Sequence, residues 1–184
     1  MPRLFKRLLW PFVVVVIGAA AALSAWQLWR PTSLRLKPVA AGVFVSQQLH
    51  DKDLLATVRP AGILTIIDFR PDGESNDQLP SDQVEKLAHQ NDMAFHYIPV
   101  PHGEIPDSAV NSLLKVLETD KKPVLLYCRT GRRAVRTFAL AEASQRNGPS
   151  ADAIAKMVKE TGFSADDLKE EIEERIKARS LLKR

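Results

Sequence analysis

Cysteine is almost absent from this sequence, since Cys128 is the only one among 184 residues. A lone cysteine cannot form a disulfide within the chain, so no disulfide framework stabilises the fold. The histidines are scattered, and His50, His89 and His96 are too far apart to suggest a metal site. We therefore expect neither a metal nor a cofactor. The role of Cys128 is either packing in the core or chemical reactivity.

Acidic residues are absent from residues 1–37, which contain six of the 26 Lys and Arg residues. The remaining 20 basic residues are matched by 22 acidic ones, so the rest of the chain has a formal charge of −2 although the whole chain has +4. This balance leaves no broad cationic face for a phosphate backbone, and no basic cluster is interleaved with aromatic residues. We therefore expect no nucleic-acid partner.

An apolar run covers residues 8–29, close to the roughly 20 residues that a helix needs to span the hydrocarbon layer. Tryptophans lie near both ends of the run, as expected of rings that anchor at the two interfaces: Trp10, Trp26 and Trp29. The pattern predicts a single-pass membrane anchor within residues 1–30, followed by an extended linker over residues 31–38.

A cleaved secretory signal is the alternative for this segment. Arg3, Lys6 and Arg7 form a basic start, and small residues near Ala22 offer a cleavage site. In both cases the rest of the chain is exported if the basic end stays inside, which places it on the periplasmic side in a bacterium. Three cations precede the run and three follow it, so charge alone does not fix the orientation.

Strand and helix patterns alternate along the rest of the chain. Apolar runs predict strands at residues 43–45, 63–69, 95–100 and 123–127, and amphipathic patterns predict helices at 51–59, 81–91, 107–119, 133–146, 150–162 and 164–180. The alternation predicts an α/β fold with right-handed crossovers, a mainly parallel sheet and helices on both faces. We assign a catalytic domain to residues 39–148 and a helical extension to residues 149–184.

The last predicted helix has an apolar face made by Leu168, Ile172 and Ile176, which follow one another at intervals of four residues. Such a face predicts packing of the extension on the domain. A helix that binds a partner is the alternative, because the pattern alone does not say what covers the face.

Cys128 follows the last predicted strand, and open α/β sheets bind ligands beyond the carboxyl ends of their strands. The next residues form a loop whose backbone N–H groups can bind an anion, with Gly131 free to adopt unusual dihedral angles and a helix beginning near Arg133. The positive end of that helix favours a thiolate at Cys128. Arg133 can hold two oxygens of a tetrahedral oxyanion while the sulfur attacks its central atom. Further substrate-binding candidates from this loop are Arg129, Thr130, Gly131 and Arg132.

Three segments resemble the phosphatase-like domain of the beta-lactamase hydrolase-like proteins: Ile67–Glu74, Tyr97–Val100 and Cys128–Arg133. The resemblance implies a dual-specificity-phosphatase fold over about residues 39–146. It also implies a cysteine thiolate that takes phosphate from a phosphomonoester, an arginine that binds the equatorial oxygens and an acid that protonates the leaving oxygen. A phosphocysteine intermediate is then hydrolysed, without a metal.

The acid that the resemblance implies falls at about Glu104, on the loop after the Tyr97 strand. Asp107 and His102 are alternatives on the same loop, and Asp107 can also be a helix cap. Asp68 and Arg70 end a neighbouring strand, where they either line the substrate pocket or form an internal ion pair.

Two features depart from the usual tyrosine and dual-specificity phosphatase loop. Four residues rather than five separate Cys128 from Arg133, and Ala134 replaces the hydroxyl residue that commonly follows the arginine. The shorter spacing also resembles rhodanese sulfurtransferases, in which the cysteine carries a sulfane sulfur. The sequence therefore leaves three hypotheses: a phosphatase, a sulfurtransferase, and a silent module that binds anions at the membrane.

Overall fold

The computed structural model describes residues 34–181, and Leu34–Arg184 form one compact unit. Within the described residues, no helix has the length and apolar character that crossing a membrane requires. The predicted anchor over residues 8–29 and the alternative cleavage site both lie outside the described residues.

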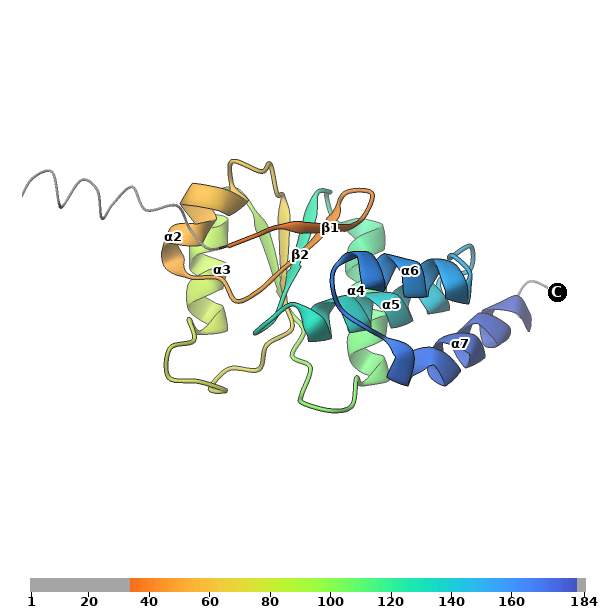
Figure 1. Cartoon of the computed structure of the whole chain (residues 1–184). Coiled ribbons are helices and arrows are strands. Elements are labelled where there is room, and N and C mark those ends of the chain that lie inside the picture. The colour runs from red at the N-terminus through yellow and green to blue at the C-terminus, as the bar shows by residue number, and fades with distance from the viewer. Residues whose placement is uncertain (1–33, 182–184) are drawn as a thin grey trace, which may run out of the picture. The chain divides into compact units, whose positions relative to one another are not determined.

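A five-stranded mixed sheet forms the centre of this unit, with strand order β1-β2-β5-β3-β4. In Figure 1 the sheet lies between two groups of helices. Its strands are β1 (Lys37–Ala40), β2 (Val43–Ser46), β3 (Thr65–Asp68), β4 (Ala94–Tyr97) and β5 (Val124–Tyr127). Strand β1 runs antiparallel to β2, and all other neighbouring pairs are parallel. The sheet is therefore mainly parallel, as the alternation of strands and helices predicted.

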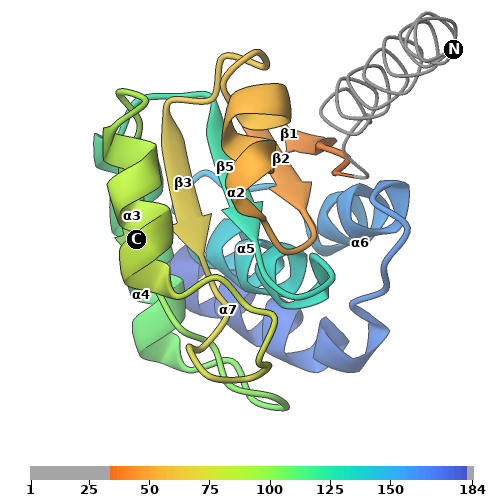
Figure 2. The ribbon, with the colours of Figure 1, turned by 90° about the vertical axis from the view of Figure 1, so that its left-hand side faces the viewer.

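Helices cover both faces of the sheet (Figure 2). One face carries the short α2 (Asp51–Asp53), the π-helical turn η1 (Leu54–Val58) and α3 (Ser81–His89). The opposite face carries α4 (Asp107–Thr119), α5 (Arg132–Ser144), α6 (Ala151–Glu160), the short 3₁₀ helix η2 (Asp166–Leu168) and α7 (Lys169–Leu181). The result is a mixed sheet flanked by helices, the architecture expected for a dual-specificity-phosphatase fold.

The buried strands supply both cores because successive side chains point to opposite faces of a sheet. On β3, Ile66 packs in the core with α3, whereas Ile67 packs in the core with α4 and α5. On β5, Leu125 and Leu126 divide in the same way. All four side chains are completely buried, and each contributes about 1.5–3 kcal/mol relative to an exposed side chain.

Strand β1 was not predicted, and it changes the boundary that we drew at residue 39. Leu34 is buried in the core with α3, and Lys37 already pairs with Val45 of β2. The fold therefore includes residues that the sequence assigned to the linker over residues 31–38. Pro38 made this segment look unlike a strand, because proline is disfavoured inside a sheet. It is tolerated here because β1 is an edge strand.

The C-terminal helices share the core on the α5 face of the sheet. Leu168 and Ile172 are buried there, and Ile176 packs against the same cluster. Arg179 of α7 is also buried, and its guanidinium donates hydrogen bonds to the carbonyls of Glu142, Ala143, Gly148 and Pro149. The bonds to Glu142 and Ala143 satisfy carbonyl groups in the last turn of α5, where helix carbonyls lack partners within the helix, and the other two bonds hold the segment that follows α5. The apolar face of the last helix therefore packs inside its own chain.

Candidate active site

The carboxyl ends of the parallel strands meet at one edge of the sheet. Tyr127, the last residue of β5, pairs with Ser46 at the end of β2 and with Asp68 at the end of β3. Cys128 follows Tyr127 directly, so this register places the thiol at the edge where open α/β sheets bind ligands. The side chain of Cys128 is buried in the core on the α5 face.

The loop after Cys128 turns its backbone toward the sulfur. Gly131 donates its N–H to Cys128 Sγ over 3.2 Å and forms the N-terminal cap of α5 with a φ angle of 95°. A Cβ atom at this position would lie 3.1 Å from the Ser46 carbonyl oxygen and 3.3 Å from the Phe163 ring. Glycine is thus required by the backbone angle and by the available space. The tight loop directs an amide and the positive end of α5 at the thiol.

Arg133, in the first turn of α5, is buried beside the same loop. Its guanidinium donates to the Val100 carbonyl over 2.6 Å and interacts electrostatically with Cys128. Burial lowers the pKa of Arg133, but contacts with Glu74 and Cys128 outweigh it and hold the pKa above its ordinary value. Arg133 is therefore a fixed cation next to the sulfur, as an arginine that binds an oxyanion must be.

Glu74 holds Arg133 in place, a role that its position in the sequence did not predict. Its two carboxylate oxygens accept one bond each from the two terminal nitrogens of Arg133, both over 2.7 Å. Glu74 also accepts from Arg70 Nε over 3.1 Å and lies 3.6 Å from His102 Nε2. The hydrogen bond from Arg133 lowers the pKa of Glu74 more than burial raises it, and Arg70 lowers it further. Glu74 is thus an ionised partner for both arginines.

A signal for Glu74 was present in the sequence. It lies on the polar loop that follows β3, and loops after parallel strands gather at the edge where Cys128 lies. An acid in that loop is a natural partner for a buried arginine, because buried charges need a partner of opposite sign. The pairing of Glu74 with Arg133 could not be identified from the sequence, because 59 residues separate the two.

Arg70 supports the site through internal bonds. In addition to its bond with Glu74, its Nη1 donates to the Gln48 side chain over 2.9 Å, and the Gln48 N–H donates to the Arg129 carbonyl. Of the two alternatives for Arg70, the ion pair is formed, but its partner is Glu74 rather than Asp68. Arg70 thereby links the loop after β3 to the loop after Cys128.

Asp68 is buried at the end of β3, where its Oδ1 accepts the backbone N–H of Arg70 over 2.7 Å. Burial raises the pKa of Asp68 to about 7, although the nearby Tyr127 hydroxyl and the Arg70 N–H both lower it. Asp68 Oδ2 and the Tyr127 hydroxyl oxygen lack a partner with hydrogen-bond geometry among the described residues. Asp68 is thus a buried carboxyl at the edge of the sheet where Cys128 follows Tyr127, and it carries a proton below about pH 7.

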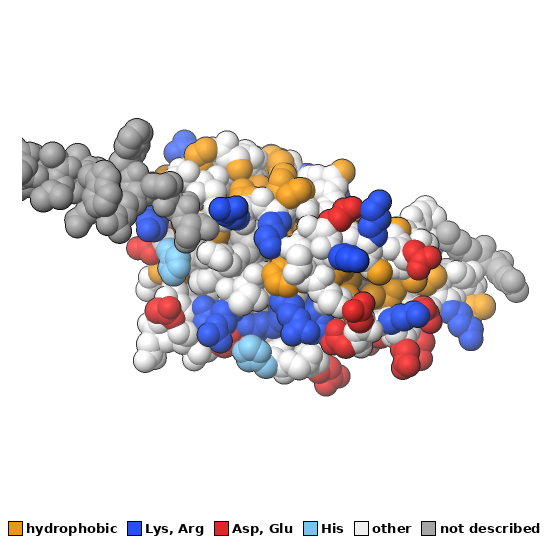
Figure 3. All heavy atoms as spheres, viewed as in Figure 1, with side chains coloured by type: hydrophobic (Ala, Val, Ile, Leu, Met, Phe, Trp, Pro, Cys, Tyr) orange, Lys and Arg blue, Asp and Glu red, His pale blue; other side chains and the backbone are white. Residues whose placement is uncertain are grey.

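A surface hollow of about 450 Å³ opens beside the Cys128 loop. It is lined by basic side chains from the loop and from α5, by the 101–105 segment and by one acid: Pro101, His102, Gly103, Ile105, Arg129, Thr130, Arg132, Arg133, Arg136 and Asp167. Figure 3 shows Lys and Arg side chains grouped near the middle of one face, with a histidine beside them. The hollow brings together the loop candidates Arg129, Thr130 and Arg132 with Arg133.

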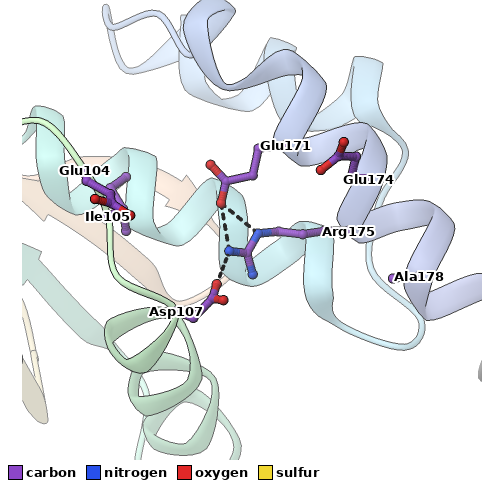
Figure 4. Close-up of a pocket in the computed structure, with 7 residues that line it drawn as sticks. All are labelled: Glu104, Ile105, Asp107, Glu171, Glu174, Arg175 and Ala178. Carbon is purple, nitrogen blue, oxygen red and sulfur yellow. Dashed lines mark hydrogen bonds and ion pairs between the residues drawn. The ribbon is translucent and has the colours of Figure 1, made fainter.

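Glu104 lies elsewhere, in a second hollow that is formed with α7 (Figure 4). The lining residues there are Glu104, Ile105, Asp107, Glu171, Glu174, Arg175 and Ala178. Asp107 forms an ion pair with Arg175 across this hollow. The structure therefore does not bring Glu104 or Asp107 among the residues that line the hollow beside Arg133. Of the three candidate acids, only His102 lies there.

The arrangement offers a buried sulfur, an inward-pointing amide and a fixed guanidinium, which together suit an oxyanion whose central atom is attacked by sulfur. Within residues 34–181, no group of three or more His, Cys, Asp or Glu side chains could hold a metal ion.

Known proteins with similar sequences share one part of this chain. Residues 35–145 match the family described as beta-lactamase hydrolase-like protein, phosphatase-like domain. A beta-lactamase hydrolase-like protein of Xylella fastidiosa is 27% identical over 109 residues, which make up 59% of this chain and 25% of that relative. The chain therefore spans about a quarter of the length of this curated relative.

Solved structures share the fold. The crystal structure of a candidate phosphatase from Neisseria meningitidis is similar to this chain, with a TM-score of 0.66 and 26% identity, covering 76% of this chain and 96% of that one. The structure of Tk-PTP in its active form has a TM-score of 0.61 and 17% identity, covering 82% of this chain and 99% of its own. The fold, the three motifs and the residues matched by the family all indicate the same family. The chain belongs to the family of the phosphatase-like domain of beta-lactamase hydrolase-like proteins.

Proposed function

We propose that this protein is a cysteine-dependent phosphatase that cleaves phosphomonoesters through a phosphocysteine intermediate. The observation that carries the proposal is the contact of one sulfur with two oxyanion-binding groups. Cys128 Sγ accepts the Gly131 N–H, and the Arg133 guanidinium interacts with the same sulfur. Both groups are placed to bind the oxygens of a phosphoryl group when it is transferred to this sulfur.

The reaction has two steps. In the first, the Cys128 thiolate attacks phosphorus, the S–P bond forms, and the ester P–O bond breaks while the leaving oxygen takes a proton. In the second, water gives a proton to the group that protonated the leaving oxygen and attacks phosphorus, the S–P bond breaks, and inorganic phosphate leaves with the thiolate restored. Arg133 binds the nonbridging oxygens in both steps, since its forked donors match their geometry.

We assign the proton for the leaving oxygen to His102. Its imidazole lines the hollow beside Arg133, where it can serve as a general acid, and lies 3.6 Å from the Glu74 carboxylate. Glu104 lines the hollow next to α7, so its side chain would have to move to reach the leaving oxygen of the substrate. Glu74 is a poor donor, because Arg133 and Arg70 keep its carboxylate ionised.

The phosphatase assay uses the full chain, purified in a nonionic detergent, with an aryl phosphate as substrate. We expect phosphate release that vanadate inhibits and that Cys128→Ser abolishes, whereas the exposed Ser112→Ala leaves it unchanged. A second assay offers thiosulfate and cyanide, because the four-residue spacing between Cys128 and Arg133 is shared with sulfurtransferases. Thiocyanate without phosphate release would replace the phosphatase proposal by sulfur transfer, and silence in both assays would leave an anion-binding module.

We also propose that residues 8–29 anchor the chain in a membrane, with the phosphatase-like domain on the exported side. The apolar run and its terminal tryptophans support this proposal. Extraction with alkaline carbonate tests the anchor, and protease added to intact spheroplasts tests the side. Release by carbonate argues against an anchor, and protection from the protease argues against export.

A further inference from the structure

The hollow beside the loop that follows Cys128 contains more positive charge than the cleavage of one phosphate requires. Four arginines and a histidine line it, and Asp167 is the only acid among the lining residues. Arg133 is already neutralised by Glu74. No ion pair is formed by the side chain of Arg129 or Arg132 within the described part of the chain. These unmatched cations lie next to the proposed phosphate site.

Arg136 is unusual among these side chains because it is buried and one of its donors has no partner among the described residues. It lies one turn beyond Arg132 on α5, and its side chain is only 10% exposed. One terminal nitrogen bonds to Asp167, whose own side chain is 56% exposed. The Nε atom of Arg136 is buried and has no hydrogen-bond partner among the described residues. A buried guanidinium with an unsatisfied donor is costly unless an acceptor reaches it.

The position of these arginines on α5 adds a second cost. Arg132 and Arg136 are four residues apart, a spacing at which like charges repel on the surface of a helix. Arg132 also begins α5, where the helix dipole disfavours a cation. Both costs are removed if an anion lies between the two side chains. The unsatisfied Nε and the paired like charges therefore point to the same missing group.

We propose that the hollow is a second anion subsite, in which Arg132 and Arg136 bind another phosphate of the substrate while Arg133 holds the phosphate to be cleaved. The proposal rests on the phosphatase function above and specifies its substrate class as small molecules with two or more phosphates on neighbouring positions. A soluble polyphosphorylated alcohol and the headgroup of a polyphosphorylated lipid share this chemistry. The volume of about 450 Å³ accommodates a headgroup of that size.

Calorimetric titration of the Cys128→Ser chain tests the subsite without turnover. The probes are inositol hexakisphosphate and inositol monophosphate, at fixed ionic strength. We expect the polyphosphate to bind at least about thirtyfold more tightly, because each added phosphate gains charge-assisted bonds to arginine. Affinities within about threefold of each other would overturn the proposal.

Two variants test which residues are responsible. Arg136→Gln and the exposed Arg132→Gln should each weaken binding of the hexakisphosphate at least about tenfold and change binding of the monophosphate much less. Arg146→Gln removes the same charge from an exposed position just beyond the end of α5 and is the matched control. The subsite is refuted if Arg132→Gln and the control have equal effects. Far-UV circular dichroism checks that the Arg136 variant is folded.

A short-chain phosphatidylinositol bisphosphate and its deacylated form, glycerophosphoinositol bisphosphate, have the same phosphates and distinguish the two sources of the ligand. Equal affinities indicate a soluble substrate, and tighter binding of the lipid indicates a headgroup; both results support the subsite, whereas binding of neither refutes it. Failure of the phosphatase proposal is seen separately, as the absence of aryl phosphate hydrolysis by the wild-type chain. Tight binding of polyphosphates without hydrolysis leaves the subsite standing and removes only the reaction.

Discussion

Asp68→Asn should change how the stability of this protein depends on pH. The Asp68 carboxyl is 1% exposed, and burial raises its pKa from 3.8 to about 7. A group with a raised pKa binds its proton more tightly in the folded state than in the unfolded state. Its contribution is therefore fully present below pH 3.8, declines as the pH rises and is lost above about pH 7.

The size of the effect follows from the two pKa values. A shift from 3.8 to about 7 corresponds to about 4 kcal/mol of unfolding free energy, lost between those two pH values. Asparagine removes the titration and keeps the local contacts. Its Oδ1 can still accept the Arg70 N–H, and its Nδ2 can donate to the neighbouring Tyr127 hydroxyl oxygen. We therefore expect Asp68→Asn to match the wild type near pH 4 and to be more stable by up to about 4 kcal/mol near pH 8.

Urea denaturation followed by far-UV circular dichroism, in a pH series, measures this difference. The exposed Ser112→Ala, which removes no ionisable group, is the control, and its difference from the wild type should stay nearly constant with pH. The stability difference between Asp68→Asn and the wild type could instead change by less than about 1 kcal/mol from pH 4 to pH 8. Asp68 would then be ionised in the folded protein near neutral pH, and the reasoning from burial would be wrong.

Three further predictions concern the residues that build the site. Glu74→Ala should lower the free energy of unfolding by about 2 kcal/mol and aryl phosphate kcat/KM by about thirtyfold, because Arg133 loses its bidentate partner. The exposed Glu85→Ala should change neither quantity, and an unchanged kcat/KM for Glu74→Ala would contradict the positioning role. Gly131→Ala should cost about 1–3 kcal/mol in urea denaturation, since alanine disfavours a φ of 95° and its Cβ would crowd the Ser46 carbonyl; a change below about 0.5 kcal/mol would count against the loop geometry. Arg179→Met should lower stability by about 3 kcal/mol, because four carbonyls lose a charged donor, whereas the exposed Lys177→Met should stay within about 0.5 kcal/mol of the wild type.

The strand, loop and helix that contain Cys128 and Arg133 could be predicted because their signals are local. A continuous apolar run ends at the cysteine, and Gly131 and the following arginines come within five residues of it. The parallel register then places the loops after β3 and β5 at one edge of the sheet without knowledge of any side chain. For this reason the fold class and the location of the loop could be predicted together.

Long-range contacts explain what the sequence left unpredicted. Glu74 becomes the partner of Arg133 only when the loop after β3 folds back toward α5. The path of that loop cannot be predicted from the hydrophobic pattern of the sequence. Glu104 has the expected position in the sequence, but it lines a hollow with residues of α7 instead of the one beside Arg133. Strand β1 was missed because Pro38 is a poor strand former, and only its place at the edge of the sheet makes it tolerable.

The clamp on Arg133 makes the site dependent on three distant parts of the chain. Its guanidinium is held by Glu74 from the loop after β3 and by the Val100 carbonyl from the segment after β4, while α5 supplies the arginine itself. Loops open locally at a lower free energy than the strands between them. A nick or a brief opening in either loop would therefore release the arginine and silence the site while the sheet stays folded. Loss of activity should precede global unfolding when the protein is heated or digested.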